Sequence, residues 1–357
     1  SREPAGVLKD AAMAQVRQVI PRDTHEQLVE GARKAFAEAR RYGLTTIHDM
    51  LAGEAHLKAY EAVRAEGGTP ARIYGRWPIA DWRRLAKRMT EQGPGDDLFQ
   101  IRALKGFADG SIGSSTALMF QPYADDPSNR GLPGSQLSRL KEWAIGADAA
   151  GLQLCIHAIG DRAIYEVLDL FETLERTNGM RDRRPRIEHD QHTHPRDFRR
   201  HVDLGVIASV QPYHAIDDGR FVEGRIGRKR VMTSYAYRTF LDEGVRMCFG
   251  SDWNVAPLNP MLGIDAAVNR RTLDGRHPEG WYPEQKITVA EAIRAYTLEN
   301  AYACYMEGKT GSITPGKYAD MIILDTDILR EPTDRIAEAK VDMTLLAGQV
   351  VYERETE

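Results

Sequence analysis

The chain has 357 residues, of which 42% are hydrophobic and 28% charged, and its formal net charge is −4. This length suits one large α/β domain with a small addition, and the nearly balanced charge gives no support to a nucleic-acid-binding surface. No apolar run reaches the roughly eighteen residues that span a bilayer, and no secretory signal opens the sequence, so neither a membrane nor a secreted protein is expected.

Short runs rich in β-branched residues alternate with amphipathic stretches, the pattern of βαβ units around a parallel sheet. The predicted strands are residues 43–50, 71–77, 99–110, 152–158, 185–191, 206–214 and 245–253. The predicted helices are residues 24–42, 54–67, 81–92, 135–150, 161–177, 195–204, 230–243 and 288–303, the last opening with the capping-box pair Thr288 and Glu291. Seven strand–helix units are one fewer than a closed (β/α)8 barrel contains.

Two segments interrupt this alternation. Residues 110–134 are rich in Gly, Pro, Ser and Asp and are too long for an ordinary connection. This loop either covers the barrel mouth or packs as a surface excursion, and both interpretations stay open. Beyond Gly308, turn-and-strand segments follow one another without barrel helices. We therefore expect a barrel over residues 1–307 and part of a small β-sandwich domain over residues 308–357.

The three cysteines are widely spaced, and none belongs to a C-x-x-C pair. We interpret Cys155, Cys248 and Cys304 as reduced thiols of a cytoplasmic protein. Two of them lie inside apolar runs, where cysteine usually behaves as a small hydrophobic residue.

Polar side chains stand where the predicted strands end. In chain order they are His48 and Asp49, Lys105 and Asp109, His157, His189, His214 and Asp252. The βα loops of such a barrel converge at the C-terminal ends of its strands, where the chemistry takes place. One histidine there is most simply a hydrogen-bonded core residue, but three histidines and an aspartate at consecutive strand ends favour a metal site. Imidazole and carboxylate groups suit zinc and similar divalent ions.

Lys105 is unusual because it lies within a predicted strand. A lysine facing the barrel interior buries an ammonium group, which is costly unless the group is paired or modified. Two interpretations stay open. The side chain can point outward between helices, or its amine can capture CO₂ and become a carbamate that bridges two metals.

The segments "LKGFADGSIGSSTALMFQPYADDPSNRG", "HAIGDRA", "RIEHDQ", "ASVQPYHA" and "GSDWNVAPLNP" occur in this order. Together they resemble the amidohydrolase superfamily, and most closely its family 3 branch, which includes N-substituted formamide deformylases. The resemblance covers nearly the whole chain and implies a metal-dependent hydrolase of C–N bonds other than peptide bonds, built on a distorted (β/α)8 barrel. By position, it implies that His157 and His189 are metal ligands. It also implies that Asp252 is a ligand and general base, and that Lys105 stands where the family has a carboxylated lysine.

The resemblance also implies a cofactor and a reaction. A divalent metal, with one or two zinc ions expected in the complete enzyme, polarises the scissile carbonyl and lowers the pKa of a bound water. Asp252 accepts the proton of that water and passes it to the leaving amine. His214 is placed to hydrogen-bond the developing oxyanion. The expected partner is a small amide-type substrate, with no nucleic acid and no membrane, and a homodimer is a further expectation.

The sequence departs from the family at its start. The first strand of the superfamily ends in a His-x-His pair, and no such strand precedes residue 24 here. We therefore expect a gap between the strands at 43–50 and 245–253, or its filling by another segment or a neighbouring chain. The alternative to an active hydrolase is accordingly a catalytically incomplete domain that binds metal poorly. His192 and His194 repeat the His-x-His spacing, but they directly precede Pro195, and we interpret them as loop and helix entry.

A glycosidase is the rival from another enzyme class, and it needs two carboxylates facing each other across the mouth of the barrel. Glu188 and Asp190 flank His189, but strand alternation turns them away from the face that His189 uses. The strand at 206–214 ends without a carboxylate, so the pattern does not favour a glycosidase.

Overall fold

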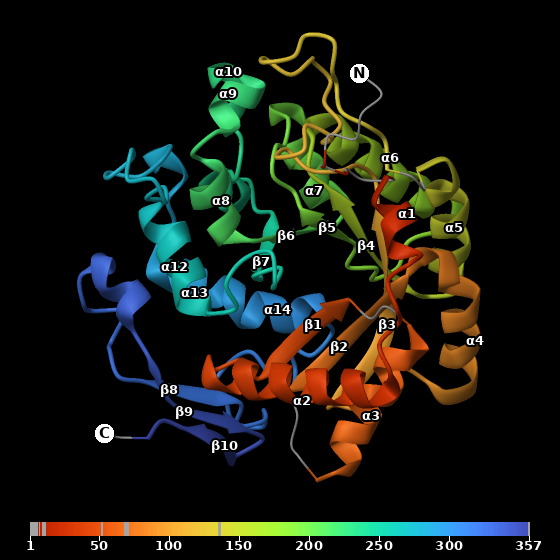
Figure 1. Ribbon diagram of the computed structural model, residues 1–357, viewed down its shortest axis with the longest axis vertical. Helices are drawn as coiled ribbons and strands as arrows, with labels where there is room; N and C mark the ends of the chain where they lie inside the picture. Colours follow the sequence, from red (N-terminus) through yellow and green to blue (C-terminus); the bar gives the residue numbers. More distant parts are fainter. Residues whose placement is uncertain are drawn as a thin grey trace.

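The computed structural model describes residues 6, 8, 12–50, 53–67, 71–134 and 137–355 (Figure 1). Its centre is a curled parallel sheet whose neighbours follow chain order. The strands are β1 (Thr46–Met50), β2 (Arg72–Pro78), β3 (Phe99–Phe107), β4 (Gln153–Ala158), β5 (Arg186–His189), β6 (Ile207–Val210) and β7 (Arg246–Phe249). Parallel neighbours joined by helical crossovers are the topology of a (β/α) barrel, which confirms the predicted fold class.

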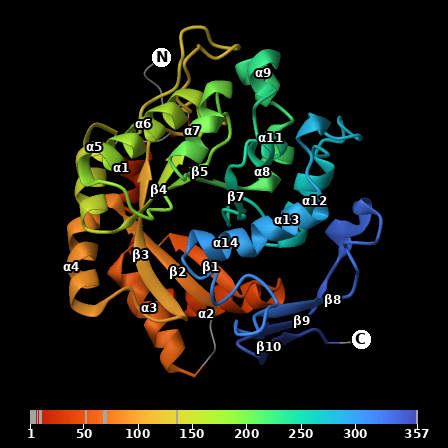
Figure 2. The ribbon, with the colours of Figure 1, turned by 180° about the vertical axis from the view of Figure 1, so that it is seen from behind.

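Helices surround this sheet (Figure 2). They are α1 (Met13–Arg17), α2 (His25–Arg41), α3 (Glu54–Ala65), α4 (Trp82–Gln92), α5 (Leu137–Ala149), α6 (Asp161–Asn178), α7 (Phe198–Asp203), α8 (Pro212–Asp218), α9 (Val222–Ile226), α10 (Arg228–Val231), α11 (Tyr237–Asp242), α12 (Pro260–Asn269), α13 (Val289–Tyr296) and α14 (Leu298–Ala303). Short 3₁₀ turns are η2 (Ile79–Asp81), η3 (Pro195–Asp197), η4 (Pro283–Gln285) and η5 (Thr333–Glu338). Within the described ranges, none of the helices has the length and apolar character that a membrane span requires.

The apolar core lies between the strands and the helices that follow them. Every residue of β4 is buried, as expected for a parallel strand covered on both faces. Ile156 of β4 packs with Ile187 of β5 and with Leu168 of α6 in one large cluster. This packing fixes the ends of the strands and so positions the polar residues that follow them.

The parallel sheet has two edges, β1 and β7. Among the residues that the structure describes, no eighth strand pairs with the outer side of either edge, in agreement with the seven strands predicted from the sequence. The residues of β1 are only partly buried and Met50 is exposed, in contrast to those of β4. Within the described ranges, no strand joins β1 to β7, and the barrel is open along the line between them.

A second, antiparallel sheet follows the barrel and consists of β8 (Met321–Leu324), β9 (Val341–Leu346) and β10 (Gln349–Glu353). It lies beside α2 (Figure 1), where the Thr344 hydroxyl donates to the Arg40 carbonyl oxygen at 2.8 Å. A buried ion pair between Arg72 and Asp320, at 2.6 Å, joins the two sheets. The C-terminal segment is thus attached firmly to the N-terminal end of the barrel strands.

Candidate metal centre

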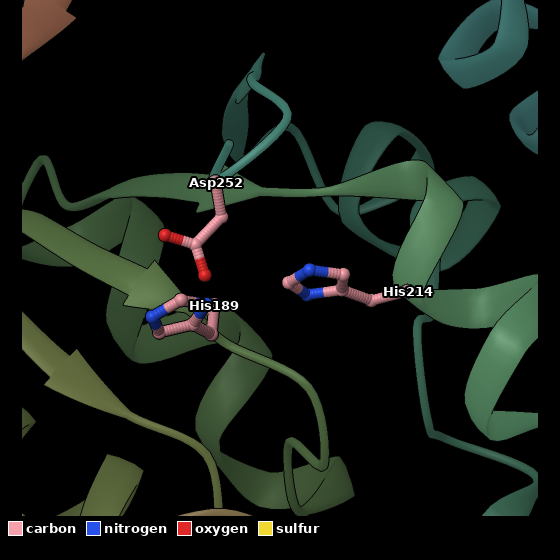
Figure 3. A group of neighbouring side chains, drawn as sticks. All are labelled: His189, His214 and Asp252. Atoms are coloured by element: carbon pink, nitrogen blue, oxygen red, sulfur yellow. The ribbon is translucent and has the colours of Figure 1, made fainter. Parts of the chain in front are cut away.

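Three side chains with metal-binding atoms meet at the C-terminal end of the barrel strands (Figure 3). His189 ends β5, His214 lies in the first turn of α8, and Asp252 follows β7. Their ligand atoms all lie within 4.8 Å of one another. The histidines are buried and Asp252 is exposed, and Figure 3 shows its carboxylate directed toward the two imidazole rings. The group is therefore buried on the side of the two histidines and open to solvent on the side of Asp252.

His157, on β4, lies beside this group. Its ring centroid is 4.6 Å from that of His189. Its Nε2 atom is 2.9 Å from the Gly110 carbonyl oxygen. A carbonyl oxygen only accepts hydrogen bonds, so Nε2 carries the proton and Nδ1 keeps a free lone pair. His157 can therefore offer Nδ1 to an ion.

His189 is held in the opposite tautomer by Gln211. The Gln211 amide nitrogen donates to the Ser209 carbonyl oxygen at 3.2 Å, and its Oε1 atom is 2.7 Å from Nδ1 of His189. Nδ1 is thus the donor, and Nε2 is left to bind a metal. Burial, together with the neighbouring His157 and Lys105 side chains, holds the pKa of His189 well below its ordinary value. The ring is accordingly neutral, as metal ligation requires.

The backbone at the end of β5 explains why His189 points inward. The φ angle of His189 is 79°, and that of Asp190 is 46°. Regular strand alternation stops there, so Glu188 and His189 both face the interior, and the prediction that alternation turns Glu188 away was wrong. The Glu188 carboxylate reaches Arg76 of β2 across the barrel at 3.0 Å and Arg186 at the same distance. Asp190 does face away from the interior, toward α7.

Lys105 points into the barrel, so the outward-facing interpretation was wrong. Its side chain is buried and interacts electrostatically with Glu188, Asp252 and His189. Burial lowers the pKa of Lys105 to about 8. The ammonium group lies 5.0 Å from the centre of the Phe107 ring. An amine with such a pKa is partly neutral near physiological pH, the form that reacts with CO₂.

The structure corrects the setting of His214. β6 ends at Val210, and α8 begins at Pro212, a residue favoured in the first helical position. His214 is therefore a helix residue and not the end of a strand at 206–214. Its Nε2 atom is buried and has no hydrogen-bond partner among the described residues. Burial lowers the pKa of His214, and the charge of Asp252 opposes this shift.

Other polar residues at strand ends serve the frame around the group. His48 pairs through Nδ1 with Arg186 at 2.8 Å, and Asp49 accepts from the Tyr60 hydroxyl at 2.6 Å. The Asp109 carboxylate accepts three backbone N–H groups, from Leu118, Ile159 and Gly160, at 2.8 to 3.0 Å. Asp109 thereby ties the 110–134 loop to the end of β4.

His192 and His194 lie outside the group, in line with their interpretation as loop and helix entry. His192 pairs through Nδ1 with the Ser234 hydroxyl at 2.6 Å. His194 precedes η3 and accepts from the Arg196 backbone N–H at 3.4 Å.

Sequence reasoning missed Gln211, Arg76 and Arg186. The two arginines carried the same signal as Lys105, a charged residue inside an apolar strand, which indicates a paired charge in the interior. Gln211 stands between the end of β6 and Pro212, so its position at a strand end was also a usable signal.

The donor set fits a divalent ion such as zinc. Neutral imidazoles and a carboxylate are its usual ligands. The unpartnered Nε2 of His214 and the tautomers of His157 and His189 leave ring nitrogens for an ion or for a ligand bound beside it. A parallel barrel with this donor set at its C-terminal end is the architecture in which metal-dependent hydrolases place their catalytic ion.

The chain belongs to the amidohydrolase family, whose model matches residues 1–352. It is 34% identical to the protein LONG AFTER FAR-RED 3 of Arabidopsis thaliana, over 99% of this chain and 62% of the relative. It is 27% identical to the N-substituted formamide deformylase of Arthrobacter pascens, over 99% of this chain and 66% of that enzyme. The chain thus spans somewhat less than two thirds of the length of these relatives.

A solved structure shows the same fold. An uncharacterized metal-dependent hydrolase from Pyrococcus horikoshii OT3 superposes with a TM-score of 0.81 at 28% identity, covering 93% of this chain and 67% of that one.

Proposed function

We propose that this chain forms the metal-binding barrel of a hydrolase that cleaves the C–N bond of a small, non-peptide amide. The observation that carries the proposal is the convergence of His189, His214 and Asp252, whose ligand atoms lie within 4.8 Å of one another. The similarity to an N-substituted formamide deformylase supports an amide as the substrate class.

In this proposal His157, His189 and Asp252 hold the ion, and Lys105 supplies a further ligand once its amine is carboxylated. When bound, a divalent metal supplies Lewis acidity to the substrate carbonyl and makes water a better nucleophile at neutral pH. Zinc is the proposed ion, because it accepts nitrogen and oxygen ligands in small coordination shells.

The residues of the chain then handle protons and charge. The Asp252 carboxylate, which is open to solvent, takes a proton from the attacking water and returns it to the leaving nitrogen. The water oxygen becomes bonded to the carbonyl carbon, the C–N bond breaks, and an acid and an amine leave. The Nε2–H group of His214 donates to the carbonyl oxygen while negative charge develops there.

Among the described residues, neither β1 nor β7 has a strand partner on its outer edge. This favours a second candidate, a barrel that holds its metal weakly and turns over poorly by itself. Equilibrium dialysis against zinc followed by elemental analysis separates the two candidates. A hydrolase barrel retains stoichiometric zinc at micromolar concentrations, and a weak binder loses it.

Variants of the ligands test the assignment of the site. We expect His189→Ala and Asp252→Asn to abolish zinc retention. His214→Asn should keep zinc but lower kcat on N-substituted formamides by about 10²- to 10³-fold, as the loss of an oxyanion donor does. His277→Ala is the control, because His277 is not part of the group. Unchanged zinc retention in both ligand variants would refute the site, and loss of zinc in His214→Asn would make His214 a ligand.

A further inference from the structure

The turn after β5 holds His189 in an unusual backbone conformation. His189 and Asp190 have φ values of 79° and 46°, in the left-handed region that non-glycine residues seldom occupy. Such strain persists only where surrounding contacts hold it. Two backbone bonds help, from Asp190 N–H to the Ala158 carbonyl oxygen and from His192 N–H to that of Ile159, each at 3.1 Å.

In addition to these backbone bonds, side-chain contacts hold the carboxylate of Asp190. Asp190 is 1% exposed, and its side chain is fully buried. The Thr193 hydroxyl donates to Oδ1 at 2.7 Å, and Nε2 of His201 lies 2.8 Å from Oδ2. Both carboxylate oxygens are therefore engaged by side chains outside the barrel interior.

His201 is itself anchored on both sides of its ring. It is fully buried, and its Nδ1 atom is 2.9 Å from the Asp197 carbonyl oxygen, one helical turn earlier. That carbonyl accepts only, so Nδ1 carries a proton and the ring cannot rotate without losing the bond. The Phe240 ring packs at 5.7 Å between centroids. The orientation of the His201 ring in the helical layer is thus fixed.

These contacts connect the helical layer to the barrel interior through two adjacent residues. His189 and Asp190 are adjacent, yet His189 faces the interior and Asp190 the helices. We propose that His201, acting through Asp190, is a positioning residue that holds His189 toward the metal. The inference rests on the proposed function, because it takes His189 as a ligand.

This role differs from a purely structural one in a measurable way. A buried pair that only stabilises the fold lowers the midpoint of unfolding but leaves the site of the folded protein intact. A positioning pair also changes the metal affinity and ligand geometry of the folded protein. Outer partners of metal-binding histidines typically cost about 10- to 100-fold in metal affinity when removed.

The experiment measures cobalt(II) affinity by chelator competition, and the visible spectrum of the cobalt complex, for the wild-type chain, Asp190→Asn, His201→Gln and the double variant. We expect each single variant to weaken cobalt binding about 10- to 100-fold and to alter the spectrum. The double variant should lose little more than either single one, because the two residues act as a unit. His192→Gln is the matched control, since His192 is also a buried histidine of this turn but pairs with Ser234. It should keep the wild-type affinity.

Cobalt affinity that is unchanged in both single variants, or weakened equally in His192→Gln, would overturn the inference. His189→Ala separates this failure from that of the proposed function. Loss of cobalt binding in His189→Ala, with unchanged binding in Asp190→Asn and His201→Gln, would refute the inference alone, whereas equal cobalt binding by His189→Ala and wild type would refute the site on which both rest. A crystal structure of metal-free Asp190→Asn decides the inference independently. We expect the contact between His189 and Gln211 to be broken. An unchanged contact and an unchanged backbone would refute the positioning role of Asp190 and His201.

Discussion

Glu188 carries the charge balance of the barrel interior. Its carboxylate lies 3.0 Å from both Arg76 and Arg186 and accepts from the Ser209 hydroxyl at 2.7 Å. Although burial alone raises the pKa of Glu188, the charges of the two arginines hold it well below its ordinary value. Glu188→Gln leaves two buried guanidinium groups without their counter-ion. We expect it to lower the free energy of unfolding by about 3–5 kcal/mol in urea titrations.

A surface ion pair provides the control for this prediction. Glu66 pairs with Arg33 at 2.9 Å, and both side chains are nearly half exposed. Glu66→Gln should cost no more than about 1 kcal/mol. Equal losses for the two variants would show that the interior network contributes nothing beyond an exposed pair.

His192 makes the stability of the fold depend on pH. Burial, assisted by the charge of Arg230, lowers the pKa of His192 to about 3 from an ordinary value of 6.5. Between these values the unfolded chain binds a proton that the folded chain does not. The stability that neutral His192 preserves is therefore complete about one pH unit above 6.5 and falls as the pH drops toward 3. The loss is about 2 kcal/mol between pH 7.5 and pH 5.

The measurement compares wild type with His192→Gln, which has no titrating group at this position. We expect the wild type to be the more stable at pH 7.5 and its advantage to shrink by about 2 kcal/mol at pH 5. A difference that is the same at both pH values would contradict the assignment.

Residue type and position at strand ends indicated which side chains to examine, and His157, His189 and Asp252 do lie at one end of the barrel. Their roles remain predictions. Alternation failed at His189, which shares the interior with Glu188 because its positive φ ends the regular strand geometry that alternation assumes. Histidine gives no signal for a positive φ of the kind that glycine gives, so the error could not be avoided from one sequence.

Among the connecting elements, the 110–134 loop packs closely against the start of α6. The Leu118 carbonyl oxygen accepts from the N–H groups of Arg162 and Ala163. A Cβ atom on Gly160 would lie 2.1 Å from that oxygen. Gly160→Ala should therefore push the loop away and cost about 1–3 kcal/mol, as overpacking does, together with a loss of activity.

Gly31→Ala in α2 is the matched control, because a Cβ atom on Gly31 would meet nothing within 4 Å outside the backbone of its own helix. Alanine favours a helix there by about 0.5–1 kcal/mol, so this variant should be more stable than wild type. Thermal unfolding measures both changes. An unchanged midpoint for Gly160→Ala would show that the loop yields without loss.

Element type was predictable and element ends were less so. Each predicted strand overlaps an observed one, because buried parallel strands read as short apolar runs. The predicted helix at 288–303 is two helices, since Thr297 leaves the helical conformation with φ −117° and ψ −85°. The predicted helix at 230–243 divides similarly into the end of α10 and α11. Tertiary packing decides such breaks, and local propensity does not reveal them.

At the scale of the whole molecule, the open barrel should show uneven stability across its sheet. In the part of the chain that the structure describes, β1 and β7 each pair with one neighbour, whereas β4 is buried and pairs on both sides. We expect amide hydrogen exchange to be slowest in β4 and clearly faster in β1 and β7, measured by mass spectrometry of peptides. Equal protection across the sheet would contradict an open barrel in solution.

The class of the molecule could be predicted because several motifs occur in the right order, and each adds to the same assignment. The substrate could not, because the conformations of long loops such as 110–134 depend on distant partners. Arg230, for example, donates to the carbonyl oxygens of Gln121 and Pro122 in that loop. Such pairings join segments more than one hundred residues apart, and a single sequence does not display them.

The placement of the cysteines gives the barrel a built-in chemical probe. Cys155 of β4, Cys248 of β7 and Cys304 beside α14 are free thiols and fully enclosed. Burial raises the pKa of each, that of Cys304 to about 12, so none reacts while the fold is closed. The rate at which a thiol reagent modifies each cysteine will therefore report how often the surrounding part of the barrel opens. Cys248 on the edge strand should be modified before Cys155 at the centre, which makes the order of labelling a direct readout of where the barrel first comes apart.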